Sequence, residues 1–275
     1  MARIRSIGTA VPQWCHPQQD ILPFMQIVYA CTEAEKRKLR FLYAQSGIRQ
    51  RFSVLSDFTR PAAEWTFFPP AENLEPFPSL EQRMAVYHRH APQLSVDAIQ
   101  DCLNGVLAPD EVTHLITVSC TGLSAPGLDL QVMELLGLPQ HTFRTSVNFM
   151  GCYAAIHALK LGNALCTADK NARVLIVCTE LCTLHFQREP TMDNIASALL
   201  FADGSAAVLL SADGDGPELT GFYSEVIPKG RRDMAWELSS TGFLMTLSGY
   251  VPDLIGEDFR GVVERAARAS GMQSG

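Results

Sequence analysis

The sequence predicts an α/β protein in which a largely buried sheet is covered by helices on both faces. Two observations lead to this prediction. Continuous apolar runs typical of buried strands, such as 114–120 and 173–178, alternate with segments of helical periodicity, such as 80–103. The hydrophobic content of 47% is ample for a buried core, and only 19% of the residues are charged. This alternation is typical of helices packed against both faces of a sheet.

The N-terminal part is expected to begin with a short strand at 3–11 and to continue with a charged helix at about 32–45. Acidic residues near the start of that helix and basic residues further on match the helix dipole. Residues 53–79 are rich in proline, aromatic and polar residues, which predicts an irregular surface excursion. Helical periodicity returns at 80–103.

The middle of the chain repeats a strand–helix pattern. Apolar runs bounded by glycine and proline predict the strands, and the segments between them predict helices. The expected elements are, in order, strand 114–120, loop 121–127, helix 128–136, extended segment 144–149, helix 153–165, strand 173–178, helix 194–200 and strand 206–210.

Residues 212–217 are the best candidate for a linker, because aspartate, glycine and proline cluster there. They would separate an N-terminal half, 1–211, from a C-terminal segment, 218–275. In that segment we expect a strand that starts near Leu219 and a final amphipathic helix at 257–270.

Composition and charge narrow the classes of partner. The net charge of −7 argues against nucleic acid as the main partner, and no apolar run reaches the length of a membrane span. The N-terminus lacks the apolar core of a signal peptide. The eight cysteines form no small-domain disulfide framework, so we expect reduced thiols and a cytoplasmic protein.

No metal site is expected. His88 and His90 would diverge on a helix, because residues two positions apart do not share a face. Cys178 and Cys182 lack the second ligand pair of a zinc site. The loop that begins at Asp213 lacks the carboxylate that a calcium loop needs at its twelfth position.

Cys152 is the most informative residue of the chain. It lies between the extended segment 144–149 and the helix predicted at 153–165, with Met150 and Gly151 forming the corner. The free amides at a helix N-terminus favour the thiolate, which is the nucleophilic form of cysteine. Gly151 would let the backbone turn sharply and leave room for a substrate. The alternative is that Cys152 is a small buried hydrophobic residue, as most free cysteines are.

Four blocks of the sequence carry a family resemblance: 119–122 with 126–129, 150–155, 201–207, and 242–245 with 247–248 and 250–252. Together and in this order they resemble a type III polyketide synthase, the chalcone/stilbene synthase branch of the thiolase superfamily. The last block and residues 234–236 are similar to bacterial members.

The resemblance implies a thiolase-like fold of five layers, α-β-α-β-α, built from two similar halves. It also implies a homodimer that condenses acyl-CoA with malonyl-CoA by decarboxylative Claisen chemistry, without a cofactor, because the CoA thioesters are substrates. Cys152 would carry the starter acyl group as a thioester.

The resemblance also assigns residues around the substrate. Phe201 would match the gatekeeper between the CoA tunnel and the cavity, and Cys120, Thr121, His185 and Met245 would line or border that cavity. For Phe201 and Met245, core packing is the alternative, because large apolar residues are usually buried.

The basic helix at 32–45 is a candidate for binding the phosphates of CoA, because phosphates need positively charged donors. Lys38 falls on a position where the family's basic contacts are expected, and Arg40 lies beside it. The other two expected positions hold Phe41 and Gln45. A solvated helix face is the alternative explanation of this charge.

The family's catalytic His and Asn lie downstream of the last helix expected here, and the sequence ends at Gly275 before them. We therefore expect an N-terminal half that is complete, a C-terminal half that is truncated, and activity that is absent or impaired. Two alternatives remain. One is a ketoacyl synthase III-like enzyme that uses an acyl carrier protein, and the other is a non-catalytic thiolase-fold subunit.

Overall fold

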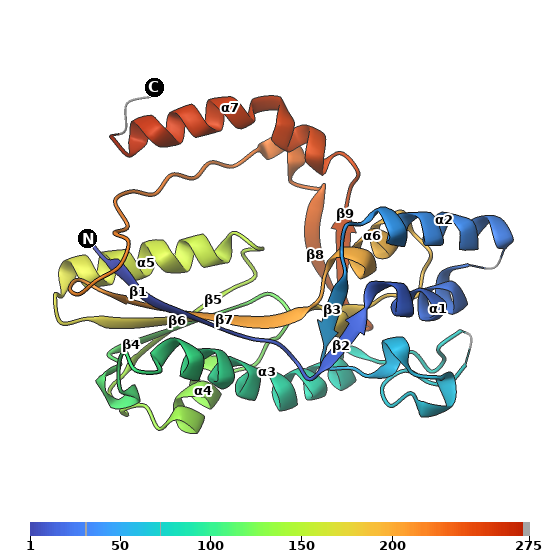
Figure 1. The fold of residues 1–275 in the computed structure, drawn as a ribbon, viewed down its shortest axis with the longest axis horizontal. Helices are drawn as coiled ribbons and strands as arrows, with labels where there is room; N and C mark the ends of the chain where they lie inside the picture. The colour runs from blue at the N-terminus through green and yellow to red at the C-terminus, as the bar shows by residue number, and fades with distance from the viewer. Residues whose placement is uncertain (31, 72, 272–275) are drawn as a thin grey trace.

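A mixed five-stranded sheet forms the centre of the computed structural model, which describes residues 1–30, 32–71 and 73–271 (Figure 1). Across the sheet the strands are β1 (Arg3–Ala10), β7 (Asp203–Ser211), β6 (Arg173–Leu181), β4 (His114–Ser119) and β5 (Phe143–Asn148). Strand β4 is parallel to both of its neighbours, whereas β7 is antiparallel to both of its own.

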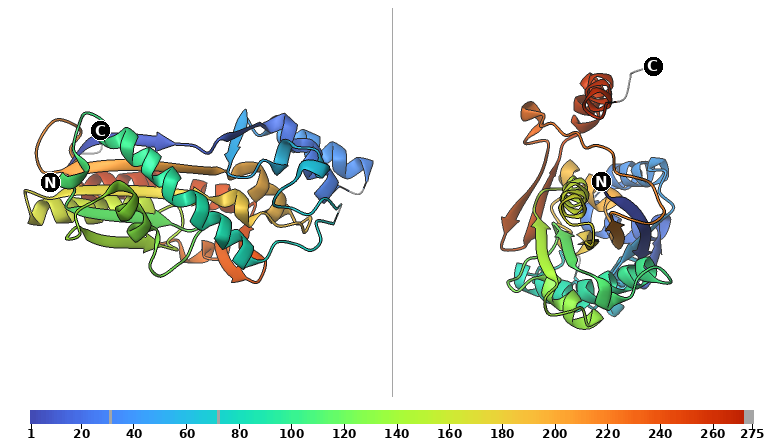
Figure 2. Two further views of the ribbon diagram at one scale, coloured as in Figure 1. Left: turned by 90° about the horizontal axis from the view of Figure 1, so that it is seen from below. Right: turned by 90° about the vertical axis from the view of Figure 1, so that its left-hand side faces the viewer.

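Helices cover both faces of this sheet. Helices α3 (Leu80–Leu103) and α4 (Leu128–Leu136) lie on one face, and α5 (Ala154–Ala168) lies on the other (Figures 1 and 2). This α-β-α arrangement confirms the predicted fold class and supplies three of the five expected layers. The bounds of α3 and α4 match the sequence-based expectation, because the start of α3 and the end of α4 carry local signals. Ser79 caps α3 in a capping box with Gln82, and α4 ends at the left-handed Gly137.

A stripe of small residues packs α5 against the sheet. Ala154, Ala158, Gly162 and Cys166 recur every four positions and are the buried residues of this helix. A side chain at Gly162 would place its Cβ 2.7 Å from the Leu210 Cδ1 atom, so the helix and the strands approach closely. The first turn of α5 is therefore held firmly over the sheet.

A smaller group of elements lies beyond one end of the central sheet (Figure 1). It contains a ribbon of β2 (Trp14–Pro17) and β3 (Gln50–Ser53), with α1 (Gln18–Tyr29), α2 (Glu33–Gln45) and α6 (Met192–Leu200). The ribbon and α1 were absent from the sequence-based expectations. The excursion at 53–79 is irregular as predicted, with short 3-10 turns at Asp57–Thr59 and Ala62–Glu64.

The remaining elements are a hairpin of β8 (Met234–Ser239) and β9 (Gly242–Leu247), followed by α7 (Val251–Ala269). The strand expected near Leu219 is wrong. Among the described residues this segment makes one isolated bridge, between Arg3 and Glu218, before the chain leaves the edge of β1. The Leu219 N–H donates to the Ala2 carbonyl at 2.9 Å, but the pairing with the start of β1 goes no further, so no strand forms.

Helix α7 starts at Val251 rather than at 257, and its geometry is interrupted at Asp258. Phe259 and Val263, which the periodicity places on one side, are 61% and 50% exposed. The helix lies on the α5 side, away from the central sheet (Figures 1 and 2). Within the part of the chain that the structure describes, no helix combines the length and the apolar character of a membrane span.

Candidate active site

The turn that carries Cys152 has an unusual backbone. Phe149 and Gly151 both adopt left-handed conformations, with φ of 56° and 71°. Helix α5 begins at Ala154 instead of at 153 as expected, so Cys152 lies two residues before the first helical residue. The left-handed Gly151 delays the helix, and its carbonyl accepts a 3.0 Å hydrogen bond from the Ala154 N–H. The Cys152 side chain is exposed.

Cys120 lies directly beneath this turn. It is buried, and the backbone amides of Gly151, Phe149 and Met150 lie close enough to its thiol to act on its pKa. Burial raises the pKa of Cys120, the nearby Glu180 raises it further, and the three amides oppose the rise. The structure thus places Cys120, expected at the cavity, under the turn that carries Cys152.

Glu180 is a polar residue of the site that the sequence-based reasoning missed. Its carboxylate accepts hydrogen bonds from the Cys120 N–H, at 2.8 and 3.0 Å, and from the Thr121 hydroxyl at 2.5 Å. Burial raises the pKa of Glu180 to about 7, although these hydrogen bonds oppose the rise. A glutamate at the end of the apolar run 173–178 was the available signal, because a buried carboxylate needs a special environment.

A third cysteine, Cys182, lies near Cys120 and Cys152. Its thiol is partly buried, and burial raises its pKa well above the usual value. The nearby Glu180, Asp203, Cys152 and Cys120 raise the pKa further, which places the three thiols within electrostatic reach of one another. Cys182 also lines the pocket described below.

The pocket lies between α1, α6, the β2–β3 ribbon and the β8–β9 hairpin. Its empty space, with the open mouth included, is about 630 Å³. His185, Phe201 and Met245 all line it, so the structure brings together three residues that the resemblance assigned to a cavity. Cys120, Thr121 and Cys152 are not among its lining residues. Apolar side chains form much of the wall, among them Ile21, Met25, Phe58, Phe186 and Trp236.

His185 is held in one neutral tautomer. Its Nε2 atom donates to the Thr121 carbonyl at 2.8 Å, and its Nδ1 atom accepts from the Phe243 N–H at 3.1 Å. The tautomer follows from these partners, because the Phe243 amide can only donate. Burial lowers the pKa of His185 to about 4. His185 therefore acts as a neutral bridge between Thr121 and β9.

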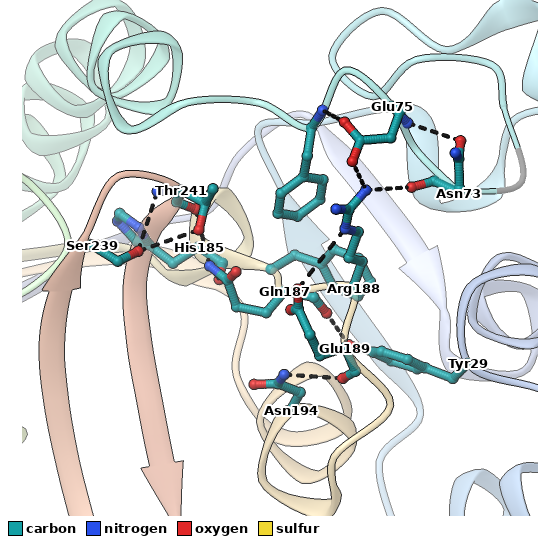
Figure 3. A network of polar contacts seen from close by, with 12 residues as sticks. Tyr29, Asn73, Glu75, His185, Gln187, Arg188, Glu189, Asn194, Ser239 and Thr241 are labelled. Atoms are coloured by element: carbon teal, nitrogen blue, oxygen red, sulfur yellow. Dashed lines mark hydrogen bonds and ion pairs between the residues drawn. The ribbon is translucent and has the colours of Figure 1, made fainter.

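The segment that follows His185 is fixed by a polar network (Figure 3). The Gln187 side chain donates to the carbonyls of His185 and Thr241, at 3.1 and 3.0 Å, and the Tyr29 hydroxyl donates to the Gln187 carbonyl at 2.5 Å. Arg188 forms a 2.5 Å ion pair with Glu75. These contacts tie the pocket wall to the turn between β8 and β9.

Asp203 fixes the start of the same segment. This buried carboxylate accepts hydrogen bonds from the Thr183 N–H at 2.8 Å, the Thr183 hydroxyl at 2.7 Å and the Val54 N–H at 2.9 Å. Burial raises the pKa of Asp203 to about 6, and the hydrogen bonds oppose the rise. Asp203 thus joins the end of β3 to the segment that carries Cys182 and His185.

The two basic residues expected at CoA lie on α2. Lys38 and Arg40 are both exposed, and the Lys38 Nζ atom is 3.1 Å from the Met192 sulfur of α6. Phe201 immediately follows α6, so Lys38 lies beside the element that leads to the predicted gatekeeper. Arg40 makes no contact that relates it to the pocket among the described residues.

Comparisons with known proteins agree with this geometry. Residues 1–214 match the N-terminal domain of chalcone and stilbene synthases. The chain is also 27% identical over 281 residues to probable polyketide synthase 1 of Dictyostelium discoideum. That match covers 98% of this chain and 8% of the much longer relative.

Solved structures show the same fold. The C-terminal type III polyketide synthase domain of Steely1, a type I/III hybrid from Dictyostelium, is 25% identical with a TM-score of 0.90, covering 99% of this chain and 74% of that one. PKS-I of the brown alga Ectocarpus siliculosus is 24% identical with a TM-score of 0.90 and the same coverage. Fold, block order and the match over 1–214 agree, and the chain belongs to the chalcone and stilbene synthase family.

Proposed function

We propose that Cys152 accepts an acyl group from an acyl-CoA, the loading step of a type III polyketide synthase. The observation that supports this most directly is the exposed thiol in a left-handed turn just before α5. The thiolate attacks the thioester carbonyl, a new carbon–sulfur bond forms, and the bond to CoA breaks. The CoA thiolate then leaves and takes up a proton.

Chain extension needs further groups. The resemblance assigns polarisation of the thioester to a His and an Asn downstream of Gly275, and malonyl-CoA to the extender role. Among the described residues no hydrogen bond joins a histidine to Cys152. His157 instead packs edge-on against Tyr153, with ring centroids 4.2 Å apart. We therefore propose that residues 1–275, acting alone, load an acyl group without extending it.

Mass spectrometry of the purified chain after incubation with hexanoyl-CoA tests the loading step. We expect one hexanoyl group on Cys152, none in a Cys152→Ala variant, and retained loading in a Cys182→Ser variant. Addition of malonyl-CoA is expected to yield no triketide. Acylation of another cysteine in the wild-type chain would refute the nucleophile assignment, and a triketide would refute the proposed lack of extension.

We also propose that a second copy of the chain covers β5. This strand pairs with β4 on one side only, and five of its six residues are exposed. Apolar side chains are exposed beside the free edge, including Phe143 at 68%, Leu123 at 52% and Met150 at 47%. An exposed strand edge with apolar neighbours favours a protein interface. Light scattering tests this, with a Phe143→Glu variant expected to be monomeric.

A further inference from the structure

The left-handed conformation of Phe149 requires a cause. Bulky residues rarely adopt positive φ, because the side chain crowds the following carbonyl. The φ of Phe149 is 56°, and the residue lies three positions before Cys152. Its N–H donates a 3.3 Å hydrogen bond to the Ser119 carbonyl. One long hydrogen bond is weak support for a strained residue, so its ring must contribute.

The ring of Phe149 contacts Phe243 of β9. The two ring centroids are 5.5 Å apart with an interplanar angle of 71°, which is the edge-on geometry that aromatic pairs prefer. Phe243 is 2% exposed, so its position is determined by the surrounding packing. Phe149 is 45% exposed and has no comparable enclosure. Phe243 is therefore the fixed member of the pair.

The same Phe243 ring forms part of the support of the pocket wall. It stacks on His185 at 4.2 Å with an angle of 10°, and it contacts Trp236 edge-on at 6.2 Å. Both His185 and Trp236 line the pocket. One buried ring thus touches the nucleophile's turn on one side and the pocket wall on the other.

We propose that Phe243 is a positioning residue, which holds the turn of Cys152 in its left-handed geometry through Phe149. The proposal rests on the proposed function in that Cys152 is the nucleophile. Its consequence is that the β8–β9 hairpin, far from Cys152 in sequence, determines where the thiol lies relative to the free amides of α5. Changes at the pocket wall are transmitted to the nucleophile through this ring.

Alkylation of Cys152 by iodoacetamide in the whole chain tests the proposal, with the exposed Cys15 as an internal reference. The alkylation rate of Cys152 divided by that of Cys15 is expected to fall roughly threefold to tenfold in Phe149→Leu, which corresponds to the free energy that an edge-on aromatic pair contributes. Phe149→Tyr keeps the ring and should restore the wild-type ratio. Phe259→Leu removes a ring of α7 that is 61% exposed and should leave the ratio unchanged. An unchanged ratio in Phe149→Leu overturns the proposal.

A double-variant cycle separates positioning from general destabilisation. Phe243→Leu should lower the ratio as much as Phe149→Leu, and the double variant should lower it little further, because both changes break one contact. Additive losses would overturn the proposal. Loading of hexanoyl-CoA on the wild-type chain is measured in parallel. If the wild-type chain does not load hexanoyl-CoA but the variants change the alkylation ratio as expected, only the proposed function is refuted. If the wild-type chain loads normally but Phe149→Leu and Phe243→Leu have the wild-type alkylation ratio, only the positioning role is refuted.

Discussion

The carboxylate of Glu180 accepts two hydrogen bonds from the backbone N–H of Cys120, 2.8 and 3.0 Å long. Cys120 in turn lies under the amides of the turn that carries Cys152. A single carboxylate on β6 therefore anchors the end of β4 and, through it, the nucleophile's turn. Because burial raises the pKa of Glu180 to about 7, this anchor changes its charge near neutral pH.

Replacement of Glu180 by glutamine should change how stability depends on pH. The folded-state pKa lies above the ordinary value of 4.5, so the folded chain binds more protons than the unfolded chain between these values. The contribution of Glu180 to the free energy of unfolding is therefore present below about pH 4.5 and is lost as pH rises through about 7, which costs up to ~3 kcal/mol. We expect Glu180→Gln to gain stability relative to the wild type between pH 5 and pH 8, measured by urea unfolding. Parallel pH curves for the two proteins, with exposed Glu237→Gln as the control, would contradict this.

His185 should show the opposite dependence. Its pKa is lowered from 6.5 to about 4, so its contribution is present above pH 6.5 and is lost as pH falls through about 4. His185→Gln should lower stability at pH 7 by about 1 kcal/mol, because the stacking on Phe243 is lost. On acidification from pH 7 to 4.5 the variant should lose less stability than the wild type. As a control, His141→Gln at an exposed position should lose as much stability as the wild type between pH 7 and pH 4.5.

Close approach of β1 and α3 makes Gly8 intolerant of any side chain. A Cβ atom at Gly8 would lie 2.2 Å from the Cys102 nitrogen and 2.3 Å from the Ala98 carbonyl oxygen, both in the backbone of α3. Because neither atom can move without shifting the helix, Gly8→Ala should destabilise the fold by about 3 kcal/mol or more. Thermal unfolding tests this against Gly249→Ala, where no atom lies within 4 Å of the added Cβ. Equal melting temperatures for the two variants would be incompatible with this packing.

The thiols should differ widely in reactivity toward iodoacetamide at pH 7. Cys152 is exposed and adjoins the free amides of α5, so we expect it to be alkylated first. Burial raises the pKa of both Cys120 and Cys182, so these should be alkylated only after unfolding. Peptide mapping by mass spectrometry measures the order. Early labelling of Cys182 would show that the pocket, and not the turn, holds the reactive thiol.

Local patterns were enough to locate most of the central elements. Ser79 marks the start of α3, Gly137 marks the end of α4, and helical periodicity locates the residues of each helix. Gly151 between an extended segment and a helix identified Cys152 as the candidate nucleophile. Local signals failed near Leu219, because the segment meets β1 at a single bridge and a strand persists only where the pairing continues.

The sequence by itself determined the fold class and the order of the elements of the central sheet and its covering helices, and it singled out Cys152 as the candidate nucleophile, because backbone periodicity and helix ends depend on neighbouring residues. Only the tertiary structure decided the rest of the site. The contacts of Glu180 with Cys120, of His185 with Thr121 and of Phe149 with Phe243 join residues about 60 to 94 positions apart. Such contacts depend on strand register and on packing across the sheet, which no short segment encodes alone.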